Sequence, residues 1–254
     1  MKDSSHIDLI YSFQNWPKLS DCHLLYNINS DDLRKKNLSI IDIIDHPTEK
    51  VSIKENDKFL DYGCGEGFCL PLISEIYGCS CFGYDIIKSK FWSDSKKIKF
   101  FSSFEKILEN GPYDSIMIHD VLDKVEKESP IQFLKNVSSL LARDGKIYMR
   151  CYPWISMQGG DLSRKTDRAF AHLVFKENSE DNNLFVVNPL KTYANFFSMS
   201  NLKMIYARKS FDFLNSFFKE NDFIKSRIIK NTGQRDLPEF QMSIKFIDYC
   251  LEKY

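Results

Sequence analysis

The chain has 254 residues, of which 43% are hydrophobic, so it can bury the core of one large α/β domain or of two small ones. Its 35 basic and 35 acidic residues cancel, which excludes a strong overall field that recruits nucleic acid or an anionic membrane but allows a local basic patch. Seven cysteines without paired metal spacing indicate reduced thiols in the cytoplasm and no metal site.

Residues 1–50 precede the first predicted strand and are expected to form short helices. One of these is predicted over 37–45, where isoleucines cluster before His46-Pro47 ends the pattern. The N-terminus has no apolar signal core, and no stretch is long and apolar enough to span a membrane. We therefore expect no membrane association and a cytoplasmic location.

Residues 59–67, with the sequence FLDYGCGEG, join a short apolar run to three glycines at alternate positions. This pattern predicts a strand that ends in a turn around a ligand, because glycine takes positive φ and lets the backbone approach a bound molecule. A dinucleotide fingerprint would have its third glycine at Phe68, and a phosphate loop would need Lys followed by Ser or Thr. The predicted ligand is therefore not held by its phosphates.

A second strand is predicted over 80–85, after a helix with apolar spacing over 68–77. This strand ends at Asp85. In a βαβ unit, an acid at this position can accept hydrogen bonds from both ribose hydroxyls of a nucleoside. Each feature alone also has a structural explanation. The glycines fit a tight turn without a ligand, Asp61 fits a helix-capping acid, and Asp85 fits an ordinary turn residue at a strand end.

Together these residues resemble the cofactor-binding half of class I S-adenosylmethionine-dependent methyltransferases. The resemblance implies a doubly wound, mostly parallel seven-stranded α/β sheet with helices on both faces and an antiparallel terminal strand. It also implies S-adenosylmethionine as cofactor and S-adenosylhomocysteine as product. The residues implied to bind the cofactor are Asp61, Tyr62, Gly63, Cys64, Gly65, Gly67, Asp85, Ile86, Ser102, Ser103 and His119.

The elements that follow have the order of this family, and the resemblance covers about residues 55–152. Ser102 and Ser103 come directly after the third predicted strand, where the family contacts the adenine ring. Strands are predicted over 98–101, 112–120 and 146–152, with a helix over 130–141 that stops at Asp144-Gly145. Later elements are predicted as a helix over 189–199, a strand over 202–207, a helix over 211–220 and a terminal strand over 241–251.

Two segments are expected to contact the substrate. Residues 153–188 leave the fifth strand at its carboxyl end, where ligands bind in open α/β sheets, and predict a mobile substrate loop within a methyltransferase domain of residues 51–254. In the family, a segment like residues 1–50 covers the cofactor as a lid. The candidate lid and substrate residues are Tyr11, Phe13, Trp16, Tyr152, Trp154 and His172, although the aromatic residues also fit core anchors and a lone histidine is more often structural.

The resemblance implies methyl transfer to a small molecule or polar metabolite. Asp120 is the preferred catalytic residue and His119 the second, because both end the fourth strand, where either can take a proton from the nucleophile or only contact the cofactor. Strand four lacks the Asn/Asp-Pro-Pro-aromatic and Pro-Cys signatures of nucleic-acid methyltransferases. The alternatives are an enzyme that acts on nucleic acid or modified bases, and a catalytically silent cofactor-binding partner subunit. The sequence predicts no oligomeric state.

Overall fold

A computed structural model describes residues 16–19, 53–125, 129–175, 188–212, 214, 216–233 and 236–254. Tyr11, Phe13 and the helix predicted over 37–45 lie outside these residues. No helix within the described ranges is long and apolar enough to cross a membrane. The chain divides into two compact units, and the predicted domain boundary at residue 50 stays a prediction.

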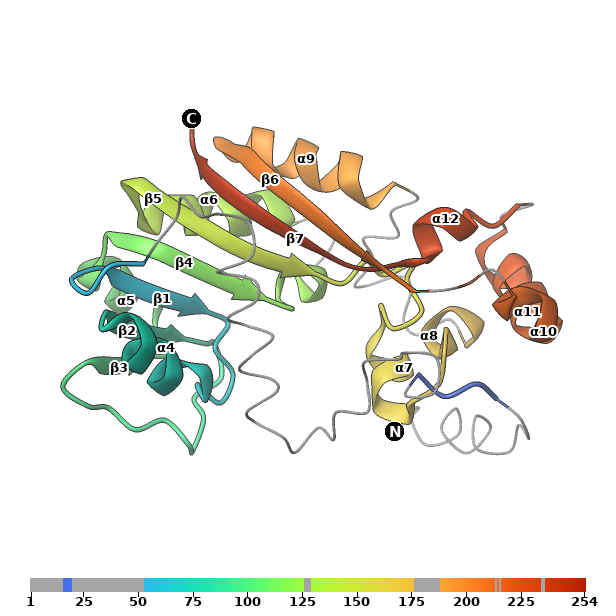
Figure 1. The fold of residues 1–254 in the computed structure, drawn as a ribbon, viewed down its shortest axis with the longest axis horizontal. Coiled ribbons are helices and arrows are strands. Elements are labelled where there is room, and N and C mark those ends of the chain that lie inside the picture. Colours follow the sequence, from blue (N-terminus) through green and yellow to red (C-terminus); the bar gives the residue numbers. More distant parts are fainter. Residues whose placement is uncertain are drawn as a thin grey trace. The chain divides into compact units, whose positions relative to one another are not determined.

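The first unit takes the described residues of 30–151, 193–208 and 248–254 and carries the parallel part of a seven-stranded sheet. The strand order is β3-β2-β1-β4-β5-β7-β6, and β7 runs antiparallel to its neighbours (Figure 1). The predicted fold class is therefore confirmed. The strands are β1 (Lys58–Tyr62), β2 (Ser80–Tyr84), β3 (Ile98–Phe101), β4 (Tyr113–His119), β5 (Leu141–Cys151), β6 (Leu202–Phe211) and β7 (Ile244–Lys253).

Helices cover both faces of this sheet, with α4 in front of it and α6 and α9 behind it in Figure 1. The chain steps outward from β1 to β2 and β3, then returns to place β4 on the other side of β1. Since crossovers between parallel strands are right-handed, the two directions put their helices on opposite faces. The helices that lie in this unit or extend into it are α4 (Cys69–Tyr77), α5 (Phe104–Asn110), η1 (Leu122–Lys124), α6 (Pro130–Leu140) and α9 (Pro189–Met199).

The core of the first unit is made by apolar strand residues and by α4. Phe59, Leu70, Ile73, Met117 and Tyr148 are each 0% exposed and belong to one cluster. A parallel strand covered on both faces reads as a nearly continuous apolar run, which is the pattern that made β1 predictable.

The helix stop predicted at Asp144-Gly145 is wrong. Helix α6 ends at Leu140, and β5 begins at Leu141, pairs with Tyr113, and then shifts register so that Lys146 lies opposite Ser115. A Cβ on Gly145 would lie 2.9 Å from the carbonyl oxygen of Asp114, so this glycine lets the irregular start of β5 pass close to β4. Regular pairing does begin at Lys146, as predicted.

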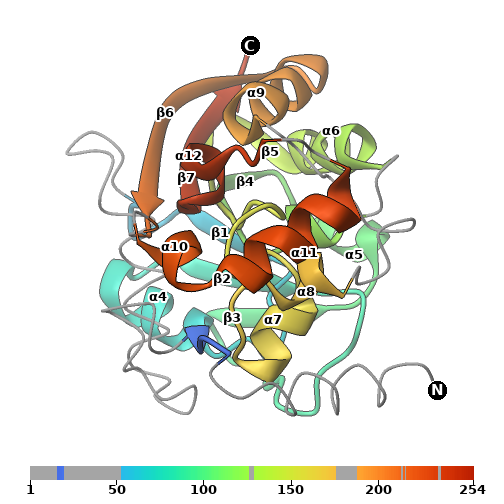
Figure 2. The same cartoon turned by 90° about the vertical axis from the view of Figure 1, so that its right-hand side faces the viewer.

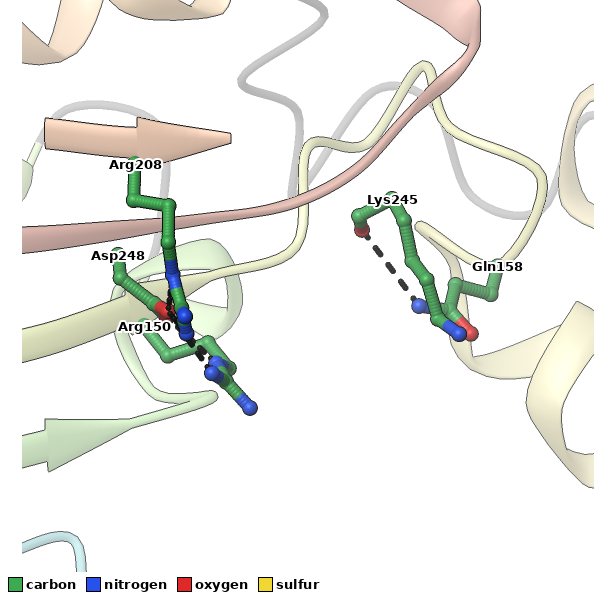
Figure 3. Close-up of polar contacts among 5 residues, drawn as sticks. All are labelled: Arg150, Gln158, Arg208, Lys245 and Asp248. Carbon is green, nitrogen blue, oxygen red and sulfur yellow. Dashed lines mark hydrogen bonds and ion pairs between the residues drawn. The ribbon is translucent and has the colours of Figure 1, made fainter. Parts of the chain in front are cut away.

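A buried ion-pair cluster joins the strands on the other side of β5. The Arg150 guanidinium donates to both carboxylate oxygens of Asp248 (2.6 and 2.8 Å), and Arg208 Nη2 donates to Asp248 Oδ2 (2.7 Å). Figure 3 shows Asp248 between the two guanidinium groups. Bidentate, charge-assisted hydrogen bonds of this kind fix geometry, so they set the positions of β5, β6 and β7 relative to one another.

The later predicted elements differ from the structure at their ends. β6 continues to Phe211, so the helix predicted over 211–220 exists only as α10 (Phe217–Glu220). The terminal strand starts at Ile244, because residues 239–242 form a short helix instead, α12 (Glu239–Met242). α11 (Asp222–Thr232) was not predicted.

The second unit takes residues 16–19 and the described residues of 152–192 and 209–247. The segment predicted as a substrate loop contains two helices in its described part, α7 (Asp161–Thr166) and α8 (Ala171–Val174). Within this unit α8 contacts α7 and α11 (Figure 2). Trp16 is a core anchor here: its indole Nε1 donates to the carbonyl of Ala169 (3.1 Å) and its ring stacks on Phe175. Figure 3 also shows a contact of this unit, from the Gln158 amide to the Lys245 carbonyl (3.5 Å).

His172 is buried in the second unit with both ring nitrogens hydrogen-bonded. Nε2 lies 2.7 Å from the carbonyl oxygen of Trp154 and must carry the proton, so Nδ1 accepts from the Ser163 hydroxyl at 2.7 Å. Burial lowers the pKa of His172 from 6.5 to about 3, with the Trp154 carbonyl opposing the shift and Arg164 adding to it. The imidazole is therefore neutral at physiological pH.

Acidification should destabilise the protein through His172. Because its folded-state pKa lies below 6.5, the unfolded chain binds the proton first, and the free energy of unfolding should fall by about 1.4 kcal/mol per pH unit below pH 6.5 until the pH reaches about 3. Urea titrations at several pH values would measure this for the natural protein and for His172→Gln, which cannot titrate. A stability difference that stayed constant between pH 7 and pH 4 would contradict the assignment.

Candidate active site

A pocket of about 750 Å³ opens at the carboxyl ends of β1, β2 and β4, where the strand order reverses. Its volume lies within the range of ligand sites. The described residues that line it are Asp61, Tyr62, Gly63, Cys64, Gly65, Glu66, Gly67, Phe68, Cys69, Tyr84, Asp85, Ile86, Ile87, Met117, His119, Asp120, Val121, Lys124, Val125 and Phe133. Most of the predicted cofactor residues are thus brought together.

The glycine turn after β1 has positive φ at all three glycines: 89° at Gly63, 54° at Gly65 and 76° at Gly67. A Cβ on Gly63 would lie 2.3 Å from Val121, and one on Gly67 would lie 2.3 Å from Phe100. A Cβ on Gly65 would meet nothing within 4 Å. Packing therefore excludes side chains at the outer two glycines, whereas Gly65 faces open space at the pocket.

Asp85 ties this turn to the end of β2. Its Oδ2 accepts a hydrogen bond from the Gly65 amide (2.9 Å), and its Oδ1 accepts one from the Ile87 amide (3.0 Å). A carboxylate has about four acceptor positions, so both oxygens retain capacity for donors from a ligand. Trp92 holds the turn from the other side, because its Nε1 donates to the Gly65 carbonyl (2.8 Å).

The two cysteines of the pocket are held as neutral thiols. Burial raises the pKa of Cys64, and the carboxylates of Asp61 and Asp85 raise it further. Burial and Asp61 likewise raise the pKa of Cys69, whose Sγ donates to Asp61 Oδ2 at 2.9 Å. Since the thiolate is the reactive form, neither cysteine is suited to act as a nucleophile.

Asp120 directly follows β4 and has a left-handed conformation, with φ of 57°. Such a conformation is uncommon outside glycine and is often found at functional sites. Its amide donates to the Arg150 carbonyl (3.1 Å), and its carboxylate pairs with Lys124 (3.1 Å), one turn further along. His119 also lines the pocket, so the structure places both predicted catalytic residues at its wall.

The charged groups that line the pocket are mostly acidic. Among the described residues of the lining there are four carboxylates, those of Asp61, Glu66, Asp85 and Asp120, and one ammonium group, that of Lys124. This balance creates a local negative potential that favours cationic ligands over anionic ones.

Ser102 and Ser103 are not among the pocket residues. Ser102 is exposed, and Ser103 is the N-cap of α5, where its hydroxyl donates to the Glu105 carboxylate at 2.5 Å. The turn residues after β2 line the pocket instead: Ile86 and Ile87 are 79% and 74% exposed.

The described substrate candidates belong to the second unit. Trp16 and His172 are buried there, with the contacts given above. Trp154 packs edge-on against His172 (4.8 Å between ring centroids), and Tyr152 packs against Phe246 (6.1 Å). Tyr11 lies outside the described residues. The substrate roles of these residues stay predictions.

Sequence reasoning missed part of the pocket wall after β4. Val121, Lys124 and Val125 line the pocket, and so does Phe133 from α6. The only signal in the sequence for Val121, Lys124 and Val125 is that they closely follow Asp120. Phe133 has no motif of its own.

The comparisons with known proteins agree with this architecture. A family model described as "Methyltransferase domain" matches residues 37–204, more than half of the chain. No curated protein matches the chain by sequence.

Three solved structures illustrate the likeness in fold. A cyclopropane synthase of Mycobacterium tuberculosis has 12% identity and a TM-score of 0.55 over 95% of this chain and 100% of its own. A SAM-dependent methyltransferase of Archaeoglobus fulgidus has 16% identity and a TM-score of 0.54 over 87% and 94%. The 1,6-didemethyltoxoflavin-N1-methyltransferase of Burkholderia thailandensis has 11% identity and a TM-score of 0.50 over 98% and 87%.

The predicted resemblance is confirmed by the family model and by the fold. This chain belongs to the methyltransferase domain family, and its fold is that of the class I, S-adenosylmethionine-dependent methyltransferases.

Proposed function

We propose that this protein transfers a methyl group from S-adenosylmethionine to a small molecule or polar metabolite. The observation that carries the proposal is the cradle formed by the Gly65 turn and the Asp85 carboxylate, which lies where parallel α/β sheets bind ligands. The reducing compartment expected for such an enzyme agrees with the free thiols of the described cysteines, and we place the protein in the cytoplasm.

The residues present fit S-adenosylmethionine. Gly65 leaves open space where any other residue would place a Cβ, and Asp85 retains acceptor capacity for ribose hydroxyls. The cofactor carries a sulfonium and an ammonium group, and the acidic lining of the pocket suits both charges. A dinucleotide with two phosphates does not suit that lining.

The cofactor supplies a methyl group that is already activated for in-line displacement. The task of the protein is therefore to align the acceptor, exclude water and manage the proton. Asp120 is the residue we assign to the proton, because it lines the pocket and Lys124 Nζ, at 3.1 Å, positions its carboxylate. His119 is the second candidate from the same strand end.

A small acceptor is favoured over nucleic acid by the charge of the pocket. Phosphate backbones are bound by clusters of Lys and Arg, whereas the described lining has one lysine among four carboxylates. The Burkholderia thailandensis neighbour was crystallised with 1,6-didemethyltoxoflavin and S-adenosylhomocysteine, which supports the same substrate class. We keep residues 1–50 as a proposed lid and 153–188 as a proposed substrate segment.

Calorimetric titration with S-adenosylmethionine and S-adenosylhomocysteine, with a nicotinamide dinucleotide as control, tests the cofactor. Micromolar binding of the first two alone is expected, and a panel of small acceptors should then yield a methylated product. Absence of binding would overturn the proposal. Binding without product across a broad panel would favour a silent partner subunit, and salt-sensitive binding of RNA or DNA would favour a nucleic-acid substrate.

Gly65→Asn should abolish cofactor binding, because the added side chain occupies the open space of the pocket while asparagine still accepts positive φ. Gly233→Asn is the matched control: Gly233 also has positive φ (69°) and nothing within 4 Å of its Cβ position, but it does not line the pocket. Calorimetry should show lost affinity in the first variant alone. Equal affinity in both variants would remove Gly65 from the site.

Asp85→Ala should weaken S-adenosylhomocysteine binding by about 1–3 kcal/mol, or roughly 5- to 150-fold in Kd, the scale for a hydrogen bond to a charged group. Asp57→Ala is the control, because Asp57 also accepts a backbone hydrogen bond, from the Lys54 amide (2.8 Å), outside the pocket. The ribose assignment would be wrong if both variants bound as tightly as the natural protein.

Asp120→Asn tests the proton acceptor, since asparagine also tolerates the left-handed conformation of this position. Once an acceptor is found, kcat should fall by about 10²-fold, a typical contribution of a general base, while the Kd of S-adenosylhomocysteine changes little. Asp114→Asn, at the other end of β4, is the control. A kcat unaffected by Asp120→Asn would show that this carboxylate takes no proton in the slow step.

A further inference from the structure

The wall of the pocket after β4 has two faces. Asp120, Val121, Lys124 and Val125 line the pocket, whereas Leu122 and Asp123 between them are buried. Leu122 is apolar, so its burial is ordinary. Asp123 is a carboxylate that is only 9% exposed, and such a group is stable inside a protein only when it is hydrogen-bonded.

Asp123 receives a hydrogen bond from a residue 70 positions away. The hydroxyl of Tyr193, on α9, donates to Asp123 Oδ1. Tyr193 is 1% exposed, and the pKa of its phenol is raised well above the ordinary value, first by burial and then by Asp123. The phenol therefore keeps its proton at any physiological pH and always acts as the donor.

The segment held in this way also contacts the glycine turn. Val121 lies directly before η1, and its side chain fills the space that a Cβ on Gly63 would need. A displacement of η1 would therefore disturb both the wall that carries Asp120 and the turn that carries Gly65. Close-packed interiors transmit such displacements because they contain few voids.

We propose that Tyr193 and Asp123 are positioning residues of the methyltransferase site: their hydrogen bond fixes η1, and through Val121 and Asp120 it fixes the cofactor pocket. Neither residue lines the pocket, so they act on the reaction only through the residues beside them. This inference rests on the proposed function and extends it to a pair of residues outside the pocket.

Tyr249 offers a matched control. It is also 1% exposed, and its ring packs edge-on against that of Tyr193 with 5.9 Å between centroids. Its hydroxyl, however, has no hydrogen-bond partner among the described residues. Tyr193→Phe and Tyr249→Phe therefore each remove one buried hydroxyl from neighbouring rings, but only the first breaks the contact with Asp123.

The first measurement needs no cofactor. Hydrogen exchange of the ligand-free protein should speed up across residues 119–125 in Tyr193→Phe and stay unchanged there in Tyr249→Phe. The reporting amides include that of Asp120, which donates to the Arg150 carbonyl, and those of Lys124 and Val125, which donate to the carbonyls of Val121 and Leu122. Unchanged exchange over 119–125 in Tyr193→Phe would overturn the proposal.

The second measurement is S-adenosylhomocysteine affinity well below the unfolding temperature. Tyr193→Phe should raise Kd about tenfold, which is roughly the effect of losing one hydrogen bond to a charged group, and Tyr249→Phe should leave it unchanged. A merely structural role would lower the unfolding temperature without changing Kd. If natural protein failed to bind S-adenosylhomocysteine at all, the proposed function would fail, while the exchange result would still test the positioning contact.

Two further variants test the proposal even if Tyr193→Phe folds poorly. Asp123→Leu also removes the hydrogen bond, in a side chain that branches at Cγ as aspartate does, and should reproduce both effects. Asp123→Asn keeps an amide oxygen as acceptor and should restore the exchange pattern and the affinity. An Asp123→Asn variant as defective as Asp123→Leu would show that the hydrogen bond is not the cause.

Discussion

The site depends on one topological constraint, the reversal of strand order between β1 and β4. Right-handed crossovers carry the chain away from β1 on one face of the sheet and bring it back on the other, so the loops that leave β1 and β4 diverge at the carboxyl edge. That divergence leaves the space in which the pocket forms. The Gly63–Gly67 turn occupies one side of it and the 119–125 segment the other.

The three glycines of the turn serve different ends although they look alike in the sequence. Gly63 and Gly67 are fixed by the protein itself, since Val121 and Phe100 occupy the places of their missing side chains. Gly65 has no such neighbour, and its amide is instead held by Asp85. The outer two glycines are therefore required by packing within the protein, whereas the central one leaves room for a ligand.

The sequence was most informative where the determining contacts are local. β1, α4, β2 and the Asp85 end follow one another within about thirty residues, so periodicity and glycine spacing specified them in register. The bulged start of β5 and the extension of β6 to Phe211 depend on pairing with distant strands, which local patterns do not record. Ser102 and Ser103 were inferred from family position alone, and here Ser103 stands at the N-cap position of α5, with its hydroxyl on the Glu105 carboxylate.

The contacts that position residues 119–125 could not be predicted from the sequence. Asp123 meets Tyr193 across 70 positions, and Arg150 meets Asp248 across 98, yet neither pair has a spacing or composition that distinguishes it from surface residues of the same type. A buried carboxylate must keep its hydrogen-bond partners, so it fixes the position of the segment that carries it. The backbone of Arg150 in turn accepts the hydrogen bond of the Asp120 amide. The position of Asp120 is therefore set by contacts that exist only once the whole sheet has formed.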